Sequence, residues 1–233
     1  MPATLTGSDT LIRVNPAPKT PPAQRSSHLA SWEFAETFVP LDEHAHAARR
    51  ASAELGVEPI STGGAALLTL LARLVGARAA VEVGTGAGVS GLALLEGLTH
   101  DGILTSIDTE PEHQQVARKL FLGAGFPARR ARLIAGGALN VLPKLSDGAY
   151  DLVFVDGDPL ETVEYVAQAG RLLRPAGVLV VNHALVGGRI ADAANEDDDV
   201  IIMREVLEAV QTMEEFKPLL LPVGDGLLIA SRT

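Results

Sequence analysis

From residue 60 onward, short apolar segments alternate with segments of helical periodicity, and this alternation constrains the fold more than any other feature. Runs such as Leu152-Val-Phe-Val and Val178-Leu-Val-Val have no polar side. A strand that is apolar on both faces is buried on both, as in a parallel sheet covered by helices. The sequence therefore predicts a doubly wound α/β fold. The predicted strands span residues 79–83, 103–108, 131–135, 150–156 and 178–182, and the predicted helices span 89–98, 111–122, 138–142 and 160–173.

The beginning of the chain departs from this pattern. Five of the 14 prolines lie in the first 25 residues, so residues 1–26 are expected to form a disordered tail. Ser27 is expected to cap a helix that runs to about Phe38 and packs on the main domain, across a dimer contact, or as a lid over a substrate pocket. Asp42 is expected to cap a second helix that Gly56 ends.

The end of the chain also changes character. A helix is predicted over residues 200–213, and two apolar segments, 217–223 and 227–230, then flank Gly224-Asp225-Gly226. Glycine and aspartate between two such segments indicate a hairpin. We expect a single domain over residues 27–233, with N-terminal helices at 27–56 and a core at 57–233.

Composition excludes several functional classes. The formal charge of −10 argues against a nucleic-acid partner, because phosphate backbones are bound by clustered Lys and Arg. The chain has no cysteine, which excludes disulfides and thiolate chemistry. Its apolar runs fall short of the ~20 residues that cross a bilayer, and the first residues lack a secretory signal. We expect a cytoplasmic protein that acts on a small molecule, with no membrane partner.

The strongest local signal is the segment Glu82-Val-Gly-Thr-Gly-Ala-Gly88, which follows a predicted strand and opens a helix. Glycines let this backbone approach a ligand closely. A nicotinamide-binding fingerprint would need glycine at position 89, where this chain has Val89, which counts against an oxidoreductase without excluding one. A carboxylate at Glu82 suits a cationic cofactor better than a diphosphate, because helix N-termini favour anions.

Asp108 ends the next predicted strand, 24 residues after Gly84. A carboxylate at that position can accept both hydroxyls of a ribose. The alternative is that Asp108 caps the helix beginning at Pro111.

Five segments taken together resemble a known family. They are residues 81–90, Ile107-Asp108, 150–156, 172–177 and 221–226. In this order they resemble the class I S-adenosylmethionine (SAM)-dependent methyltransferases, and more narrowly the O-methyltransferases typified by the catechol and caffeoyl-CoA enzymes. The resemblance implies a mostly parallel, Rossmann-like seven-stranded sheet ending in an antiparallel hairpin. It also implies SAM as cofactor, a hydroxyl of a small, aromatic acceptor as substrate, and a homodimer.

The resemblance also implies roles for individual residues. Ile60 and Ser90 would hold the methionine carboxylate. Gly84 and Thr85 would lie along the methionyl part, with Glu82 beneath them. Asp108 would bind the ribose, Thr109 and the turn at Gly137 and Ala138 would contact the adenine, and Asp156 would hold the amino group. Asp158 would lie near the methyl-transfer centre, or would simply cap the following helix.

The chain departs from its relatives at the metal and base positions. Their metal set is two aspartates and an asparagine, whereas the matching residues here are Asp156, Asn182 and His183, and their catalytic lysine is Pro159. Magnesium prefers hard oxygen ligands and should bind this set poorly, although a softer divalent ion remains an alternative.

Two hypotheses follow for His183. In the first, it is a metal-independent general base, a task that suits an imidazole with its ordinary pKa near ~6.5. In the second, it is structural, and the acceptor is already nucleophilic or the protein binds the cofactor with little catalysis. A methyltransferase with an amine or a macromolecule as acceptor also remains open.

Overall fold

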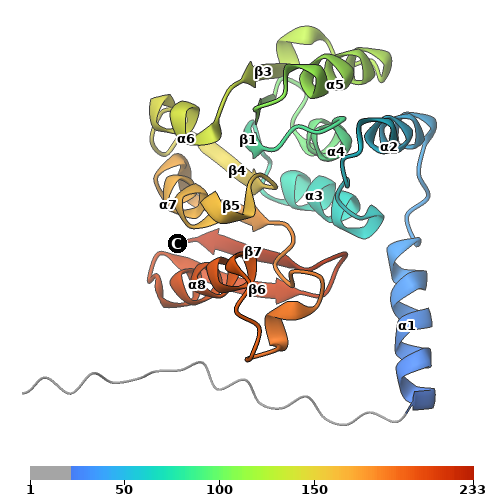
Figure 1. The fold of residues 1–233 in the computed structure, drawn as a ribbon. Coiled ribbons are helices and arrows are strands. Elements are labelled where there is room, and N and C mark those ends of the chain that lie inside the picture. Colours follow the sequence, from blue (N-terminus) through green and yellow to red (C-terminus); the bar gives the residue numbers. More distant parts are fainter. Residues whose placement is uncertain (1–21) are drawn as a thin grey trace, which may run out of the picture.

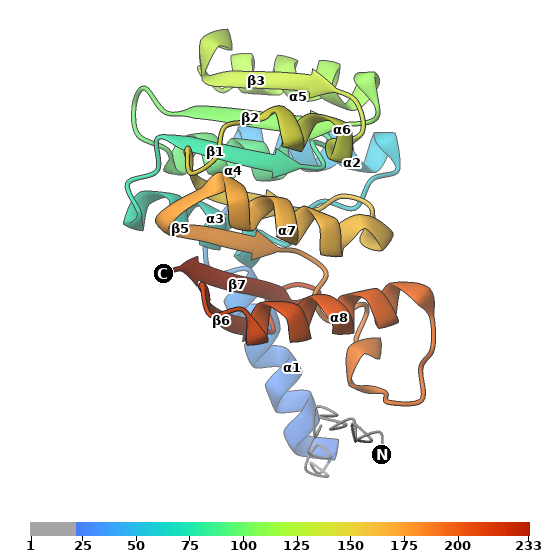
Figure 2. The same cartoon turned by 90° about the vertical axis from the view of Figure 1, so that its left-hand side faces the viewer.

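The computed structural model describes the backbone of residues 22–233 and the side chains from residue 28 onward. It forms a three-layer α/β domain around one seven-stranded sheet (Figures 1 and 2). The strands are β1 (Ala79–Val83), β2 (Ile103–Asp108), β3 (Ala131–Ala135), β4 (Tyr150–Val155), β5 (Leu173–Val181), β6 (Phe216–Leu221) and β7 (Leu227–Arg232). The helices are α1 (Pro22–Glu36), α2 (Glu43–Leu55), α3 (Thr62–Leu74), α4 (Val89–Gly97), α5 (Pro111–Gly123), α6 (Ala138–Val141), α7 (Thr162–Leu172) and α8 (Asp198–Thr212), with short 3-10 turns between some of them.

The strand order is β3-β2-β1-β4-β5-β7-β6. β1 to β5 pair in parallel, and β7 is antiparallel to both β5 and β6. The order reverses between β1 and β4, where both strands end at the same edge of the sheet. A doubly wound sheet binds its ligands at this switch point. The predicted fold, including the terminal hairpin, is confirmed.

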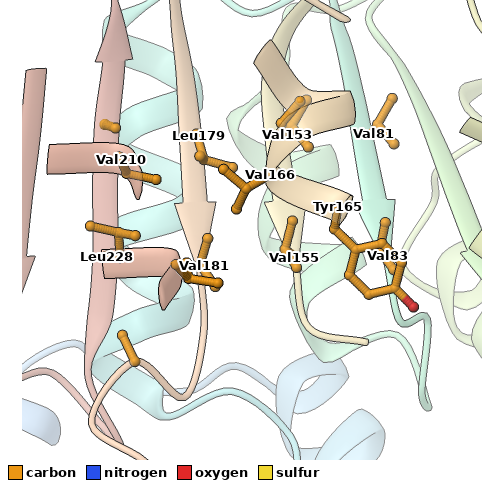
Figure 3. Close-up of a cluster of buried hydrophobic side chains, with 14 of the residues drawn as sticks. Val81, Val83, Val153, Val155, Tyr165, Val166, Leu179, Val181, Val210 and Leu228 are labelled. Atoms are coloured by element: carbon orange, nitrogen blue, oxygen red, sulfur yellow. The ribbon is translucent and has the colours of Figure 1, made fainter. Parts of the chain in front are cut away.

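Both faces of the sheet are buried, as the apolar strands predicted. Alternate residues of β1, β4 and β5 point to opposite faces, so Val153 and Val155 pack under α7 and α8 while Leu152 and Phe154 pack under α3 and α4. Figure 3 shows the first of these clusters, with Val166 of α7 lying among the strand valines. Because successive side chains face opposite layers and both layers are apolar, the sequence of each strand shows no polar alternation.

β5 begins five residues earlier than predicted. Pro175 and Gly177 were expected to separate helix from strand, but they lie inside β5. The pairing register between β4 and β5 shifts at this point, and Ala176 has a φ of 62°. An irregular strand start tolerates a proline, because the missing N–H falls where the ladder is already broken.

The N-terminal helices agree with the sequence in part. α2 starts after Asp42, whose Oδ1 accepts the Ala45 N–H at 2.7 Å, and it ends at Gly56 with a φ of 69°, as predicted. α1, by contrast, begins at Pro22, a residue suited to the first helical position, so Ser27 lies inside the helix and is not its cap. Residues 1–21 of the predicted tail lie outside the described part of the chain. Residues 22–26, which were also predicted to belong to the tail, are part of α1.

α1 stands beside the domain, and only part of it packs there (Figure 1). Leu29, Phe34 and Phe38 are mostly exposed. The indole Nε1 of Trp32 donates to the Pro222 carbonyl at 2.9 Å, which fastens the helix to the loop between β6 and β7. None of the helices between residues 22 and 233 has the length and apolar run that a membrane crossing requires.

Candidate functional site

A cavity of about 520 Å³ opens at the carboxyl edge of the parallel strands, beside the switch point. It is lined by the loops that follow β1, β2, β3, β4 and β5 and by the segment before α3. The lining includes almost every residue that the resemblance assigned to the cofactor: Ile60, Gly84, Thr85, Ser90, Asp108, Thr109, Gly137, Ala138, Asp156 and Asp158. The structure thus brings these residues together, although their individual roles stay predictions.

The residue that follows β1 must be a glycine. Gly84 has a φ of 91°, and a Cβ built on it would lie 2.1 Å from the carbonyl oxygen of Asp156. Two strand ends therefore approach more closely at this position than any side chain would allow. This contact brings the glycine loop and Asp156 to the same wall of the cavity.

Asp108 fastens the glycine loop from the neighbouring strand. Its Oδ2 accepts the backbone N–H groups of Thr85 at 2.9 Å and Gly86 at 3.0 Å, and its Oδ1 accepts the N–H of Glu110 at 2.8 Å. The carboxylate lines the cavity and also stabilises the turn before α5, although the N-cap residue of that helix is Glu110. The contact of Asp108 with a ribose stays a prediction. Oδ1 retains a free lone pair for a ligand.

His113 was missed by the sequence analysis. It lies in the first turn of α5, lines the cavity, and places Nδ1 3.4 Å from Asp108 Oδ2. The available signal was its place in the first turn of a helix that begins at the cavity edge, since such a turn faces the loop before it.

Glu82 lies beneath the glycine loop and outside the cavity lining, fully buried. Ser90 Oγ donates to its Oε1 and Ser106 Oγ to its Oε2, each at 2.5 Å. Burial raises the pKa of Glu82 to about 8, with Asp156 and Asp108 adding to the shift and the two serine hydroxyls opposing it. The hydroxyl of Ser90, which was expected to hold the methionine carboxylate, thus donates its hydrogen bond to Glu82.

The N-terminus of α4 lies at the cavity without a side-chain cap. Gly88 precedes the helix with a φ of 92° and no side chain caps it, and both Val89 and Ser90 line the cavity. Unpaired N–H groups of a first helical turn favour a carboxylate. Ile60, which also lines the cavity, is buried, and its carbonyl accepts a hydrogen bond from the Arg49 guanidinium at 2.9 Å.

The cavity is acidic. Its lining contains six carboxylates and, among the residues that the structure describes there, no Lys or Arg. Such a wall favours a cation and opposes a diphosphate. Glu82, on which the sequence prediction rested, is not among the carboxylates that make it acidic, because Glu82 lies outside the lining. The six are Glu58, Asp108, Glu110, Asp156, Asp158 and Glu161.

Asp156 and His183 meet at the far end of this cavity. His183 Nε2 lies 3.5 Å from Asp156 Oδ1, which also accepts the Asn182 amide N–H at 3.0 Å. Burial raises the pKa of Asp156 to about 6, with His183 and Asn182 opposing the shift. His183 follows β5 with a φ of 56°, a strained backbone for a residue with a side chain.

Asp225 is the partner that sequence reasoning did not assign. Its Oδ2 lies 3.1 Å from His183 Nδ1, and its Oδ1 accepts the Gly187 N–H at 2.7 Å. The sequence analysis included the residue in a hairpin turn and in one of the segments that carry the family resemblance, without giving it a role. No sequence signal links positions 183 and 225, because antiparallel pairing of β5 with β7 brings them together.

A second cavity of about 230 Å³ adjoins the first and shares Asp156 and His183 with it. Its apolar lining comes from Val155, Val181, Val186 and Met203. Arg189 also lines it, but its guanidinium is paired with Asp197 and Asp199, so the acidic segment before α8 is partly neutralised.

Asp158 caps the turn that follows it. Its Oδ1 accepts the Leu160 N–H at 2.9 Å, at the start of the 3-10 turn Pro159–Glu161. The capping alternative is thus met by the geometry, and the side chain also lines the larger cavity.

The residues at the expected metal position do not fit magnesium. Asp156 is the one carboxylate of the set, Asn182 turns its amide N–H toward it, and the third member is an imidazole whose Nδ1 faces Asp225. Across the described residues, no group of three or more His, Asp or Glu side chains is arranged to hold a metal ion. A cation with octahedral oxygen preference needs more oxygen donors than these, so we derive no step through a metal.

Comparison with solved structures defines the class of protein. A protein of Corynebacterium glutamicum superposes with a TM-score of 0.82 at 32% identity, covering 90% of this chain and 97% of that one. The O-methyltransferase TomG of Streptomyces achromogenes, solved in complex with SAM, superposes with a TM-score of 0.79 at 30% identity, covering 88% and 96%. The fold and its acidic cavity are those of a class I methyltransferase that uses SAM as cofactor.

The family within that class follows from sequence comparison. A family model described as O-methyltransferase matches residues 39–233. A Mycobacterium tuberculosis protein named Probable O-methyltransferase Rv1220c is 46% identical over 215 residues, which cover 92% of this chain and 95% of that protein. The chain belongs to the O-methyltransferase family and is a SAM-dependent O-methyltransferase, which confirms the resemblance seen in its motifs.

Proposed function

We propose that the protein methylates a hydroxyl of a small, aromatic acceptor in the second cavity, with His183 as general base. The observation that carries this proposal is the position of His183. It lines both cavities, so it stands between the cofactor and the space left for an acceptor. In this proposal Nδ1 donates to Asp225, and Nε2, which lies 3.5 Å from Asp156 Oδ1, takes the proton of the acceptor.

The size and lining of the second cavity support a small acceptor. Its volume of about 230 Å³ lies below the ~300–1,000 Å³ of pockets for drug-sized ligands. The valine and methionine side chains offer an aromatic ring apolar contact, and the hydroxyl would then point toward His183 and Asp156.

In this proposal the residues of the larger cavity hold SAM. Asp108 Oδ1 would accept a ribose hydroxyl, and Thr109 with the Gly137-Ala138 turn would lie along the adenine. The N-terminus of α4 would take the methionine carboxylate, and Asp156 would take the ammonium group. These assignments rest on the cavity lining and on the charge of each group.

The reaction is an in-line displacement at the methyl carbon. The acceptor oxygen forms a bond to the methyl carbon as the bond from carbon to the sulfonium sulfur breaks, and its electron pair stays on sulfur. The hydroxyl proton passes to His183 Nε2. Asp156 and Asp225 flank the imidazolium that forms and stabilise its charge. The sulfonium already activates the methyl, so the protein mainly aligns and desolvates the two reactants.

Substitution of His183 tests this assignment. H183A should lower turnover at least ~100-fold, because proton transfer by a positioned side chain contributes about that much. The measurement is transfer of radiolabelled methyl from SAM to a panel of phenols and catechols, with S-adenosylhomocysteine affinity by calorimetry as the control for an intact cofactor site. An unchanged rate in H183A would remove the histidine from the mechanism. A wild-type protein that binds the cofactor product yet methylates no member of the panel would contradict the aromatic acceptor.

The homodimer and the cytoplasmic location stay predictions. So do the expected lack of nucleic-acid and membrane partners and the chemical identity of the small-molecule acceptor.

A further inference from the structure

Glu36, the last residue of α1, makes two bonds that join distant parts of the chain. Its Oε2 accepts the backbone N–H of Gly63 at 2.8 Å, and its Oε1 accepts the backbone N–H of Gly224 at 2.7 Å. One carboxylate thus bridges the start of α3 and the loop between β6 and β7. Bonds between an ionised carboxylate and backbone N–H groups are among the stronger hydrogen bonds in proteins.

Each end of this bridge adjoins the site. Gly63 lies in the first turn of α3, three residues after Ile60, which lines the cofactor cavity. Gly224 immediately precedes Asp225, the partner of His183. Glu36 therefore connects the wall of the cofactor cavity to the residue that orients the proposed base.

The loop that carries Asp225 is packed closely against Ser61, the residue before α3. Gly224 has a φ of 57°, and a Cβ there would lie 2.8 Å from Ser61 Cβ and Oγ. Trp32, one turn before Glu36 in α1, holds the same loop through its bond to the Pro222 carbonyl. Two side chains of one helix thus fix the loop at positions 222 and 224.

The bridge is not part of the core. Among the described side chains, both apolar clusters that cover the sheet are built from residues 48 onward, and residues 28–36 of α1 contribute no member to them. Phe34 in the last turn of α1 and Phe38 just after the helix are 71% and 73% exposed. Loss of the Glu36 bonds should therefore leave the sheet and its two layers folded.

We propose that Glu36 is a positioning residue for methyl transfer, which fixes the loop of Asp225 and through it the orientation and tautomer of His183. The proposal rests on the proposed role of His183 as base. α1 then acts as a strap that couples the cofactor wall to the base, and undocking of α1 would leave a protein that binds SAM but transfers methyl slowly.

The test uses E36Q with E33Q as its matched control. Gln keeps the size of the side chain but replaces one of the two acceptor oxygens with an NH₂ group that faces a backbone N–H. Glu33 lies in the same helix and is exposed, so E33Q makes the same chemical change away from the bridge. D225N and the double variant E36Q/D225N complete a double-mutant cycle.

The first readout needs no acceptor. In protein labelled with ¹⁵N-histidine and saturated with S-adenosylhomocysteine, the ring signals of His183, assigned through H183Q, report its tautomer. We expect E36Q to move these signals, E33Q to leave them in place, and E36Q/D225N to match D225N alone. Superposable wild-type and E36Q spectra, or additive shifts in the double variant, would overturn the proposal.

The second readout is turnover with whichever phenol the wild-type protein methylates. E36Q should lower kcat about 10-fold or more while the affinity for S-adenosylhomocysteine stays the same, and the loss should vanish in the D225N background. A loss of cofactor affinity with unchanged kcat would instead assign Glu36 to the cofactor wall and overturn its role at the base. If H183A turns out fully active, the proposed function fails, whereas the NMR result still decides whether Glu36 positions His183.

Discussion

The two cavities share Asp156 and His183, but they are held together in different ways. The larger cavity, which is the proposed cofactor half of the site, is fastened by bonds between neighbouring parallel strands and the loops that follow them, such as those from Asp108 to backbone groups 22 and 23 residues away. The second cavity, which is the proposed acceptor half of the site, depends on the contact across 42 residues between His183 and Asp225, and the loop that carries Asp225 is tied to Glu36 across 188 residues. The larger cavity forms wherever the parallel strands pair, because its residues lie at the strand ends. The second cavity also requires α1 and the loop between β6 and β7 to dock.

Because of this difference, we expect substitutions in the cofactor half and in the acceptor half to have different effects. Changes near the strand ends should affect folding and cofactor binding together, because the same bonds serve both. Changes around the hairpin loop should affect turnover first and leave cofactor binding intact. The following predictions test that division.

The largest effect is expected at Gly84. G84A places a methyl group 2.1 Å from a backbone carbonyl that cannot move without displacing β4, and it does so at a φ of 91°. We expect a loss of about 3 kcal/mol or more in the free energy of unfolding, measured by urea denaturation, together with loss of S-adenosylhomocysteine binding.

G86A is the matched control for this change. Gly86 has a φ of 48°, and no atom lies within 4 Å of the position that a Cβ would take, so only the backbone conformation is penalised, by about 1 kcal/mol. If G84A and G86A lose equal amounts of stability and of cofactor binding, then the close approach of β1 to β4 is not needed for the cofactor half.

A smaller effect, which depends on pH, is expected at Glu82. Its pKa in the folded protein is raised to about 8 from an ordinary 4.5, so the folded state holds its proton more tightly than the unfolded state. The stabilisation from this proton is complete below the ordinary pKa and is lost as pH rises through the folded value. Relative to wild type, E82Q should therefore gain stability progressively between pH 4.5 and 8 and stay level above that.

The measurement is the free energy of unfolding of wild type and E82Q across this range. Their difference isolates Glu82 from other titrating groups, of which Asp156 and Asp108 lie close enough to raise its pKa. A difference that does not change with pH would mean that Glu82 is ionised throughout and is neutralised by a partner.

The smallest effect is expected from metal removal. Because the donor set at Asp156, Asn182 and His183 does not fit magnesium, EDTA and added Mg²⁺ should leave turnover unchanged. Stimulation by Mn²⁺ or another softer ion, lost in H183A, would show that the acceptor half uses the histidine as a ligand and not as a base.

Much of the cofactor half could be predicted from the sequence. The glycine loop, Asp108 and Asp156 each follow an apolar strand, and parallel strands carry such residues to one edge. The position of Glu82 outside the cavity, and the bond from Ser90 to it, could not be predicted, because the choice of face depends on which strand residues turn toward α4.

The acceptor half was largely hidden from sequence reasoning. Asp225 was visible as a turn residue within the segment 221–226 but was given no role, and Glu36 was not singled out at all. The apolar side chains Leu29 and Phe34 of the first helix are mostly exposed and so did not indicate what the helix holds. Its contacts with the loop between β6 and β7 are polar ones, from Trp32 and Glu36.

The sequence by itself determined the strands, the glycine loop, the doubly wound fold and the family, because these depend on local hydrophobic period and on residues close together in the chain. Only the tertiary structure decided what surrounds His183. The pairing of β5 with β7 and the docking of α1 bring carboxylates from distant positions to one imidazole and one loop, and contacts between such positions leave no periodic or local trace in the sequence.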